Sequence, residues 1–396
     1  MDYSSNLKKQ QECYEEKRAC VDFYPRSMNI EVTSFCNYEC KMCPHALLKN
    51  KIAKHLDMRV IEALEPYFKY CSDVSLQGDG EPFMNPDIHK IVKVLKLHDV
   101  KLSTTTNLSI FDDRIAKLVS ENFNMITVSC DACDKEVYES IRKNGDYINF
   151  CKNLDMLVRS ARNTKIALNC VLMRQNIHLA EKMIDFAKTH GVDKVMFSNL
   201  LTDVDLKTES DSLEGITKTA YYHIDSAERR ARELGIELVI GWDYSSNVED
   251  DEKEVTCEPV IKRLFTENEI EEFRKRYERS KVVNTKVCDS GKYKCKGMCS
   301  NIFDRIYVDA KGNLSVCCFS KMNPIGNVTE TPFEEIWNGY VYKKYRQDFF
   351  DGKLPDFCIG CKYALSIVNG QKQSWPFKII NIDSEFSSNL SFWNNR

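Results

Sequence analysis

The chain has 396 residues, with 56 Lys and Arg against 59 Asp and Glu, and a formal net charge of −3 at pH 7. This balance excludes the broad cationic face of a protein that binds nucleic acid non-specifically. Apolar residues make up 43% of the chain, which excludes a disordered composition. No apolar run reaches the roughly 20 residues that span a bilayer, and the polar N-terminus lacks the apolar region of a signal peptide. We therefore expect a cytoplasmic protein with no membrane partner.

Cysteine is the unusual component of this chain, with 18 residues among 396. The chain is long, with strong helix and strand patterns and no signal peptide, so it is unlike a short secreted disulfide-rich domain. In a reducing compartment, clustered thiols bind metal more often than they form disulfides. The cysteines that cluster along the chain are therefore candidate metal ligands.

Predicted strands and helices alternate over the first 200 residues. Strands are expected at residues 28–34, 73–78, 100–106, 124–130, 165–171 and 193–199. Helices are expected at residues 57–69, 87–97, 112–120, 134–143, 148–162 and 177–190, the last one ended by Gly191. Six strands separated by helices predict an α/β fold with a parallel sheet, a partial (β/α)6 TIM-like barrel. Reactive groups are then expected at the carboxyl ends of the strands.

The pattern changes after residue 200. A helix at 213–234 and a strand at 236–242 precede an acidic loop at 248–254 and a charged helix at 267–280. Cysteine and glycine become frequent from residue 288, which predicts a second, smaller domain with a β-hairpin. We expect five parts: an N-terminal extension (1–27), the partial barrel (28–242), an insert (243–287), the Cys-rich domain (288–371) and a tail (372–396).

Three cysteines lie close together immediately after the first predicted strand. Cys36, Cys40 and Cys43 have the spacing C-x3-C-x2-C. Three thiolates on one short loop can bind three irons of a [4Fe–4S] cluster and leave the fourth iron open to a substrate or cofactor. The alternative is a zinc site that takes its fourth ligand from His45. The position at the carboxyl end of a strand, where α/β enzymes keep their chemistry, favours the cluster.

The strand ends that follow carry motifs that resemble the radical S-adenosylmethionine (SAM) superfamily. Residues 78–82, Gly-Asp-Gly-Glu-Pro, look like the family's G-x-G-E-P segment, whose backbone and acidic side chain receive the methionyl ammonium of SAM. Residues 105–107, Thr-Thr-Asn, are similar to the T-N-G stretch that faces the cofactor, with Leu108 in place of the glycine.

The resemblance continues through the fourth, fifth and sixth strands. Residues 129–131, Ser-Cys-Asp, resemble the S-x-D motif, whose serine contacts the SAM carboxylate, and Arg142 looks like the arginine that commonly follows it. Asn169 resembles the asparagine that reaches the ribose, and Met196 would border the adenine. The SAM-binding residues implied by the resemblance are Gly78, Gly80, Glu81, Pro82, Thr105, Thr106, Asn107, Ser129, Asp131, Arg142, Asn169 and Met196.

This resemblance implies a chemistry. In the family, the reduced cluster binds the amino and carboxylate groups of SAM through its open iron and transfers one electron to the sulfonium. The resulting 5′-deoxyadenosyl radical abstracts hydrogen from a substrate C–H bond. Cluster and cofactor carry the difficult step, and the protein positions the substrate and excludes quenching. The expected electron donor is a small flavodoxin or ferredoxin.

Four further cysteines form a second group in the C-terminal part: Cys299, Cys317, Cys358 and Cys361. The stretch between the first two spans a predicted β-hairpin with its turn at residues 311–313, which places both thiols side by side. The later C-x2-C pair supplies two more ligands. Four thiolates would supply every protein ligand of the metal site and leave no coordination position open to a substrate.

The second group resembles the SPASM and shorter twitch extensions of radical SAM proteins, including G-N-x at 326–328 and E-I-W-N at 335–338. The resemblance implies one auxiliary [4Fe–4S] cluster, and a structural zinc ribbon is the alternative. Cys288 and Cys295 are unassigned, which leaves a second auxiliary cluster open. Cys318 is a rival of Cys317 as a ligand, and the spacing from Gly312 favours Cys317.

A fully ligated second cluster suits electron transfer better than substrate coordination. We therefore expect an oxidoreductase that dehydrogenates or epimerises a small molecule such as a sugar or aminocyclitol. An epimerase needs a thiol that returns hydrogen to the substrate radical, and the candidates are Cys130, Cys133 and Cys170.

Two alternatives remain open. One is a maturase that forms a thioether, a crosslink or an epimer in a ribosomally made peptide. The short stretch before residue 28 argues against it, since such enzymes usually bring a leader-binding domain there. The other is a non-catalytic iron–sulfur or zinc carrier, which has no need of the strand-end motifs.

Overall fold

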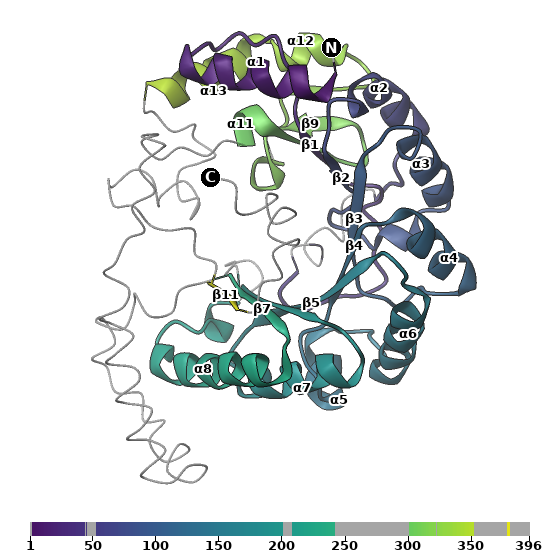
Figure 1. The fold of residues 1–396 in the computed structure, drawn as a ribbon, viewed down its shortest axis with the longest axis vertical. Helices are drawn as coiled ribbons and strands as arrows, with labels where there is room; N and C mark the ends of the chain where they lie inside the picture. Colours follow the sequence, from purple (N-terminus) through teal and green to yellow (C-terminus); the bar gives the residue numbers. More distant parts are fainter. Residues whose placement is uncertain are drawn as a thin grey trace.

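The computed structural model describes residues 2–43, 45, 53–200, 208–241, 301–321, 323–351 and 378–380 (Figure 1). Within these residues, eleven strands form one open sheet in the order β10-β9-β8-β1-β2-β3-β4-β5-β6-β7-β11. The sheet curves, and Figure 1 shows the helices on its outer side. The predicted α/β class with an incomplete parallel barrel is confirmed.

Strands β1 to β7 run parallel to one another. Their bounds are β1 Ser27–Ile30, β2 Asp73–Ser75, β3 Lys101–Thr106, β4 Met125–Ser129, β5 Lys165–Leu172, β6 Lys194–Asn199 and β7 Glu237–Ile240. The helices between them are α2 Met58–Phe68, α3 Ile88–Leu95, α4 Asp113–Asn122, α5 Lys135–Ile141, α6 Tyr147–Ser160, α7 Ala180–Thr189 and α8 Thr217–Leu234. Short 3-10 turns are η2 Pro82–Met84, η3 Ile177–Leu179 and η4 Glu209–Asp211.

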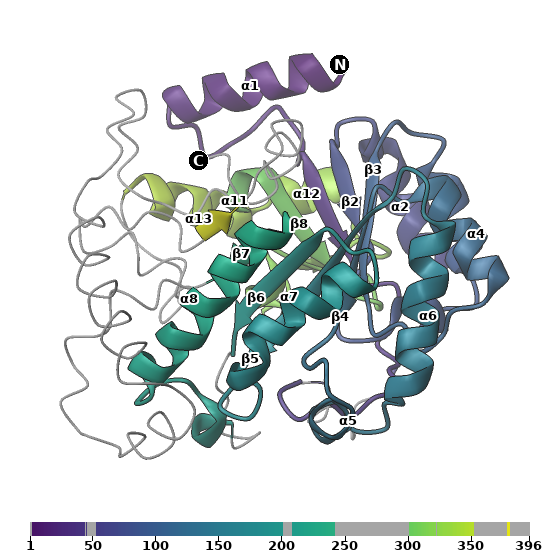
Figure 2. The same ribbon diagram turned by 60° about the horizontal axis from the view of Figure 1, so that its bottom comes forward.

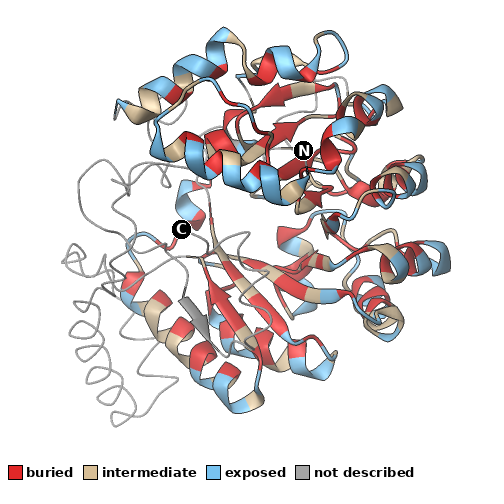
Figure 3. Cartoon of the chain, turned by 45° about the horizontal axis from the view of Figure 1, so that its top comes forward, coloured by how far each residue is buried: buried red, intermediate tan, exposed pale blue. Residues whose placement is uncertain are grey.

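Hydrophobic periodicity explains why the helices form and which face they bury. On α3 the buried residues are Ile88, Ile91, Val92 and Leu95, at the i, i+3, i+4 and i+7 positions of one helix face. Figure 3 shows the same division on the other helices, with buried faces toward the sheet and exposed faces outward. Among the described helices, none combines the length and apolar character needed to cross a bilayer.

Helix ends follow the expected capping chemistry. Asp112 begins α4 by accepting hydrogen bonds from the backbone amides of Arg114 and Ile115. Gly191, two residues after α7, and Gly235, which caps α8, have φ angles of +70° and +69°. A left-handed backbone is the conformation in which glycine ends helices most readily. The predicted helix end at Gly191 is therefore confirmed.

The predicted C-terminal hairpin is present, and it continues the main sheet. Helix α11 (Asn301–Asp304) leads into β8 (Arg305–Val308), and β8 pairs with the antiparallel strand β9 (Asn313–Ser315). Gly312 in the turn has a φ of +84°. Strand β8 also lies parallel to β1, with Ser27 opposite Arg305 and Ile30 opposite Val308. Sequence patterns did not indicate this pairing, because the partners lie far apart in the chain.

The remaining elements complete the C-terminal part and the N-terminus: η5 Cys318–Ser320, β10 Gly326–Asn327, α12 Phe333–Trp337, α13 Tyr340–Phe350, β11 Lys378–Ile380 and α1 Tyr3–Glu15. β11 pairs antiparallel with β7. The acidic loop at 248–254, the helix at 267–280 and the predicted boundaries at 243 and 288 lie outside the described residues. The five-part division remains a prediction.

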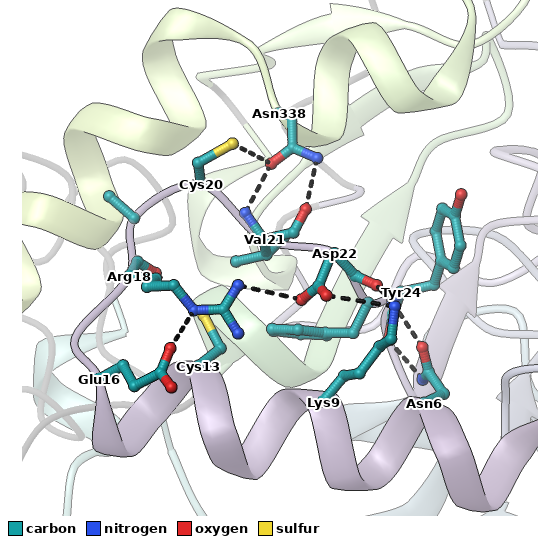
Figure 4. A network of polar contacts seen from close by, with 12 residues as sticks. Asn6, Lys9, Cys13, Glu16, Arg18, Cys20, Val21, Asp22, Tyr24 and Asn338 are labelled. Atoms are coloured by element: carbon teal, nitrogen blue, oxygen red, sulfur yellow. Dashed lines mark hydrogen bonds and ion pairs between the residues drawn. The ribbon is translucent and has the colours of Figure 1, made fainter. Parts of the chain in front are cut away.

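Tyr14 of α1 packs against Phe349 and Phe350 of α13, with ring centroids 6.2 and 6.4 Å apart. Figures 1 and 2 show α1 on the side of the molecule that carries α12 and α13. Figure 4 shows the polar contacts at this junction, where Asn338 pairs with the backbone of Val21. The Asn338 side chain accepts from the Val21 amide at 3.0 Å and donates to the Val21 carbonyl at 2.8 Å. Trp337 Nε1 donates to the Phe23 carbonyl at 2.8 Å. Residues of the E-I-W-N stretch therefore tie the N-terminal extension to the C-terminal part.

Beside this junction, Arg346 is fully buried among aromatic rings. Its guanidinium carbon lies 4.2 Å from the Trp337 ring centroid and 4.6 Å from that of Tyr342. Nη1 donates to the Trp337 carbonyl at 2.8 Å. Burial lowers the pKa of Arg346 to about 10, which still leaves it charged at neutral pH. Ring faces stabilise such a cation because their quadrupoles are negative above the ring plane.

We predict that Asn338→Ala lowers the free energy of unfolding by about 1–3 kcal/mol, because it leaves the amide and carbonyl of buried Val21 without partners. Urea unfolding measures this loss. The matched control is Asn149→Ala, at an exposed position of α6. Equal stability of the two variants would contradict the assigned role of Asn338.

Candidate functional site

The three cysteines of the C-x3-C-x2-C motif lie on the loop that follows β1, as predicted, and all three side chains are half-buried. The end of α5 holds this loop: the Glu39 amide donates to the Lys143 carbonyl at 3.0 Å, and the Lys41 amide to the Ile141 carbonyl at 2.9 Å. The Lys41 ammonium forms an ion pair with Asp211 at 2.8 Å. Contacts at Glu39 and Lys41, which lie between the cysteines, thus hold the loop in place against neighbouring elements.

Burial raises the pKa of all three thiols, and that of Cys40 reaches about 12. Arg142 opposes this shift at Cys40, whereas Asp131 and the other two cysteines add to it. The thiols therefore lie close enough to influence one another, and each would release its proton on binding a metal. Within the described part of the chain, no three His, Cys, Asp or Glu side chains are placed to share a single metal ion. In an iron–sulfur cluster, by contrast, the thiolates bind different irons.

Two side chains from outside the loop donate to these sulfurs, one from the end of β3 and one from the C-terminal end of α5. Asn107 Nδ2 lies 3.9 Å from Cys36 Sγ, and Arg142 Nη1 lies 3.8 Å from Cys40 Sγ. Donors aimed at cluster sulfurs are a usual means of stabilising the added negative charge of the reduced state. Three thiols on one loop with such donors fit a [4Fe–4S] cluster. His45, the candidate fourth zinc ligand, has its Nε2 3.0 Å from the Ser34 carbonyl.

The glycine-rich segment 78–82 lies against the loop after β1 with no space for side chains at its two glycines. A Cβ on Gly80 would lie 2.4 Å from the carbonyl oxygens of Thr33 and Phe35. A Cβ on Gly78 would lie 2.2 Å from Glu31 Cγ. Glycine is therefore required at both positions by close packing. This packing brings the segment next to the cysteine loop.

Glu81 is buried, and its carboxylate is occupied by the protein itself. Its oxygens accept hydrogen bonds from the Thr106 hydroxyl at 2.7 Å and from the backbone amides of Asn107 at 2.7 Å and Phe83 at 3.4 Å. Burial raises the pKa of Glu81 to about 7, although these donors oppose the shift. The side chain thus ties the end of β2 to the end of β3, whereas the family resemblance implied that it receives the methionyl ammonium.

Leu108, which replaces the expected glycine, has a φ of +60°. The backbone therefore keeps the left-handed conformation that glycine adopts freely, at a cost of about 1–2 kcal/mol for a leucine. The Leu108 side chain is fully buried, its amide donates to Thr106 Oγ1 at 2.9 Å, and its carbonyl accepts from Asn153 at 2.9 Å. Burial of a leucine side chain stabilises the folded state by a similar or larger free energy, so leucine is tolerated at this position. Thr105 donates to Gln77 Oε1 at 2.6 Å.

Ser129, Asn169 and Met196 form a row across β4, β5 and β6. Ser129 is opposite Asn169, and Asn169 is opposite Met196. All three are half-buried, while Leu168 and Val195 next to them are fully buried. Side chains alternate between the faces of a strand, so this row shares the face opposite the buried neighbours. Ser198 Oγ donates to Asn169 Oδ1 at 2.6 Å.

Asp131 and Arg142 form a buried ion pair, with Arg142 Nη2 2.7 Å from Asp131 Oδ2. Asp131 Oδ1 also accepts from the Val171 amide at 2.8 Å. Burial opposes the Arg142 charge, but Asp131 together with Cys40 and the other acidic groups around it outweighs burial, so the pKa of Arg142 is raised. Arg142 therefore joins the S-x-D segment to Cys40, an arrangement that the sequence did not reveal.

The three candidate hydrogen-donor thiols differ in placement. Cys130 and Cys170 are buried, and their thiols lie 3.3 Å from the Ala132 carbonyl and 3.6 Å from the Asp131 carbonyl. Cys170 follows Asn169 on β5, so it points to the opposite face of the sheet. Cys133 is half-buried and packs against the core. The structure does not bring Cys170 onto the face of the row that contains Asn169.

Of the second cysteine group, the structure describes Cys317, which is half-buried, and Cys318, which is exposed. Cys299, Cys358 and Cys361 lie outside the described residues, as do Cys288 and Cys295. The backbone amide of Cys317 donates to Ser320 Oγ at 3.0 Å, which holds the turn that follows β9. The choice between Cys317 and Cys318 stays a prediction.

Sequence reasoning missed two contacts from the C-terminal part, one to the glycine-rich segment and one to Glu31 beside it. Lys321 forms an ion pair with Asp79, and Tyr307 Oη donates to Glu31 Oε2 at 2.5 Å. The sequence signals this network only by an acidic residue, Glu31, within the predicted strand at 28–34, and Glu31 by itself does not identify its partners.

We predict that Arg142→Met lowers the free energy of unfolding by about 3–5 kcal/mol, because it leaves Asp131 charged and unpaired in the interior. Urea unfolding of this variant is compared with that of Arg159→Met, at an exposed position of α6. A loss below about 1 kcal/mol would disprove a stabilising role for the pair.

A second prediction concerns the pH dependence of stability. Because the Glu81 pKa lies near 7 in the folded state, above its ordinary value of 4.5, the folded protein keeps this proton to a higher pH than the unfolded chain. The free energy of unfolding therefore loses about 3 kcal/mol as pH rises from about 4.5 to about 7. Urea unfolding without SAM should show that Glu81→Gln removes this slope. The exposed Glu62→Gln variant should keep it, and an unchanged slope in Glu81→Gln would refute the assignment.

Two family models match this chain. The radical SAM superfamily model matches residues 30–187, and the SPASM iron–sulfur cluster-binding domain model matches residues 299–362. The chain is 23% identical to the AdoMet-dependent heme synthase of Methanosarcina barkeri, over 85% of this chain and 91% of that protein. It is 24% identical to the mycofactocin maturase MftC of Mycolicibacterium smegmatis, over 42% of this chain and 43% of that protein.

Solved structures share this fold at low sequence identity. Streptococcus suis SuiB bound to S-adenosylmethionine has a TM-score of 0.60 at 14% identity, over 91% of this chain and 75% of that chain. SuiB bound to the precursor peptide SuiA has a TM-score of 0.58 at 15% identity, over 86% and 71%. The protein anSMEcpe with bound AdoMet has a TM-score of 0.58 at 16% identity, over 89% of both chains.

The two domain matches identify the cofactors: a [4Fe–4S] cluster and SAM for the first domain, and auxiliary iron–sulfur clusters for the second. Together with the open parallel barrel, they establish that the chain belongs to the radical SAM superfamily and has a C-terminal SPASM domain.

Proposed function

We propose that this enzyme oxidises a small molecule after hydrogen abstraction, with the auxiliary cluster domain as the electron acceptor. One observation carries the proposal. Lys321, three residues after Cys318, pairs with Asp79 in the segment beside the first cysteine loop. Its charge contributes to the electrostatic environment of both the Cys43 and Cys318 thiols. The two cysteine-bearing regions are thus neighbours, as electron transfer between them requires.

In this proposal, Cys36, Cys40 and Cys43 hold the first [4Fe–4S] cluster, which when bound and reduced supplies the electron that cleaves SAM. The backbone at 78–82 packs directly against the segment that leads into the cysteine loop, because neither glycine carries a side chain, and we infer that this places it beside the methionyl ammonium. Carbonyl groups there would accept its protons. Glu81 keeps the segment in place through Thr106 and Asn107 rather than through direct contact with SAM.

The row across β4 to β6 would bind the rest of SAM. Ser129, Asn169 and Met196 offer a hydroxyl, an amide and an apolar side chain on one face, suited to a carboxylate, a ribose and an adenine. Arg142 and Asn107 donate to cysteine sulfurs and favour the reduced state of the cluster. A small flavodoxin or ferredoxin is the proposed electron donor.

The relatives bear on the substrate class. Similarity to the heme synthase extends over most of both chains, including the C-terminal part, which supports a small-molecule substrate. The second candidate function is modification of a peptide. It is supported by the similarity to the maturase MftC, which covers less than half of this chain, and by the fold shared with peptide-bound SuiB. Membership of the radical SAM superfamily favours either enzyme over a non-catalytic carrier.

The proposal predicts the iron content. Anaerobic reconstitution of the wild type should give about eight irons per chain if one auxiliary cluster is present, and the Cys36/Cys40/Cys43→Ala variant about four. Only the wild type should produce 5′-deoxyadenosine from SAM and a reductant. Cys20→Ala/Cys151→Ala, which changes two thiols outside both groups, is the control and should behave as the wild type.

Three outcomes decide between the candidates. Oxidised small molecule formed in equal amount to 5′-deoxyadenosine supports the proposal. Binding of a ribosomally made peptide at micromolar concentration, followed by its modification, replaces the first candidate by the second. Zinc bound by the three cysteines and His45 in anoxically purified protein refutes both.

A further inference from the structure

Two residues of the C-terminal part reach the glycine-rich segment 78–82. Tyr307 on β8 is buried, and its hydroxyl donates to Glu31 Oε2 at 2.5 Å. The same oxygen accepts from the Asp79 amide at 3.2 Å. Lys321 forms an ion pair with the Asp79 side chain. The C-terminal part therefore contacts Asp79 directly through Lys321 and indirectly through Tyr307 and Glu31.

Glu31 is the centre of this network, one residue beyond the end of β1. It is 4% exposed, and burial raises its pKa, with Asp79 adding to the shift and Tyr307 opposing it. Two carboxyl groups thus lie near each other at the start of the glycine-rich segment. Like charges at close range repel, most strongly where water is excluded. The Lys321 ammonium offsets this repulsion.

The segment has no room to adjust if this balance changes. Glu31 Cγ already fills the space where a Cβ of Gly78 would lie, and the Thr33 and Phe35 carbonyls do the same at Gly80. The Glu81 amide donates to the Phe35 carbonyl at 2.8 Å. A shift of Asp79 away from Glu31 would therefore move the backbone between the two glycines, which includes carbonyl groups that the proposed function assigns to the methionyl ammonium.

We propose that Lys321 and Tyr307 are positioning residues for SAM: they hold the 78–82 backbone in its binding conformation, so that SAM affinity depends on the SPASM domain. This inference rests on the proposed function, since it takes 78–82 as the segment that binds the methionyl ammonium. It assigns the SPASM domain a second role, independent of electron transfer. The residues act through Asp79 and Glu31 and do not themselves contact SAM.

The test measures SAM dissociation constants by equilibrium dialysis on anaerobically reconstituted full-length protein. Lys321→Met should weaken SAM binding about tenfold, and Tyr307→Phe should weaken it in the same direction. Lys321→Arg keeps the positive charge and should retain most of the affinity. The matched control is Lys311→Met, an exposed lysine in the turn of the same hairpin, which should bind SAM as the wild type does. All variants should keep the wild-type iron content.

A double variant separates positioning from damage to the fold. In Lys321→Met/Asp79→Asn the repulsion between Asp79 and Glu31 is removed together with the lysine. This variant should therefore bind SAM more tightly than Lys321→Met alone. In steady state, Lys321→Met should raise KM for SAM and leave kcat for 5′-deoxyadenosine formation at saturating SAM nearly unchanged.

The outcomes distinguish this inference from the proposed function. If the wild type binds SAM and Lys321→Met binds it equally well, the inference is wrong and the proposed function stands. A loss of affinity in Lys321→Met that Asp79→Asn does not reverse also overturns the inference, because it points to general damage. If the wild type itself fails to bind SAM, both the inference and the proposed function are wrong.

Discussion

Strand β1 is the constraint on which the site depends, because it is paired on both sides. Met28 lies between Val74 of β2 and Ile306 of β8, and all three strands run parallel. The cysteine loop and Glu31 both follow directly from its carboxyl end. Central strands cannot slide by one residue without turning every side chain to the wrong face. The register of β1 thus fixes the position of the first cysteine group relative to both halves of the sheet.

Around this edge, buried and half-buried acidic groups each have an oppositely charged partner or several hydrogen-bond donors. Asp131 has Arg142, and Asp79 has Lys321. Glu81 instead accepts hydrogen bonds from three neighbouring groups. Buried charges are costly unless paired and hydrogen-bonded, so such a set is unlike an ordinary core. Buried groups with shifted pKa values gather where binding or catalysis takes place, which agrees with the cofactor site of a radical SAM enzyme.

The junction between the N-terminal segment and helices α12 and α13 contains contacts of a different kind. The N-terminal segment pairs with Asn338 and Trp337 and lies beside the Arg346 stack, far in sequence from its partners. These contacts involve backbone groups and aromatic faces rather than pairs of opposite charges. They stabilise the C-terminal part that presents Tyr307 and Lys321 to the glycine-rich segment. The N-terminal segment therefore contacts the same C-terminal part from which Tyr307 and Lys321 reach the proposed SAM site.

Local patterns in the sequence determined most of the barrel. Alternating and 3.6-residue periodicities predicted the parallel strands and their helices, since burial of one face is a local requirement. Cys36, Cys40 and Cys43 were predictable as a group because their spacing lies within one loop. Gly312 indicated the hairpin turn because its φ of +84° suits glycine.

Only the tertiary structure decided which distant residues meet. The pairing of β8 with β1, the Arg142 contact with Asp131 and Cys40, and the contact of Lys321 with Asp79 all join residues that no local pattern connects. Leu108 shows the same limit: the sequence marked it as a departure from the motif, but its left-handed backbone is held by Thr106 and Asn153. Sequence periodicity reports the face that a residue buries, whereas its partners across the fold depend on how the strands pair.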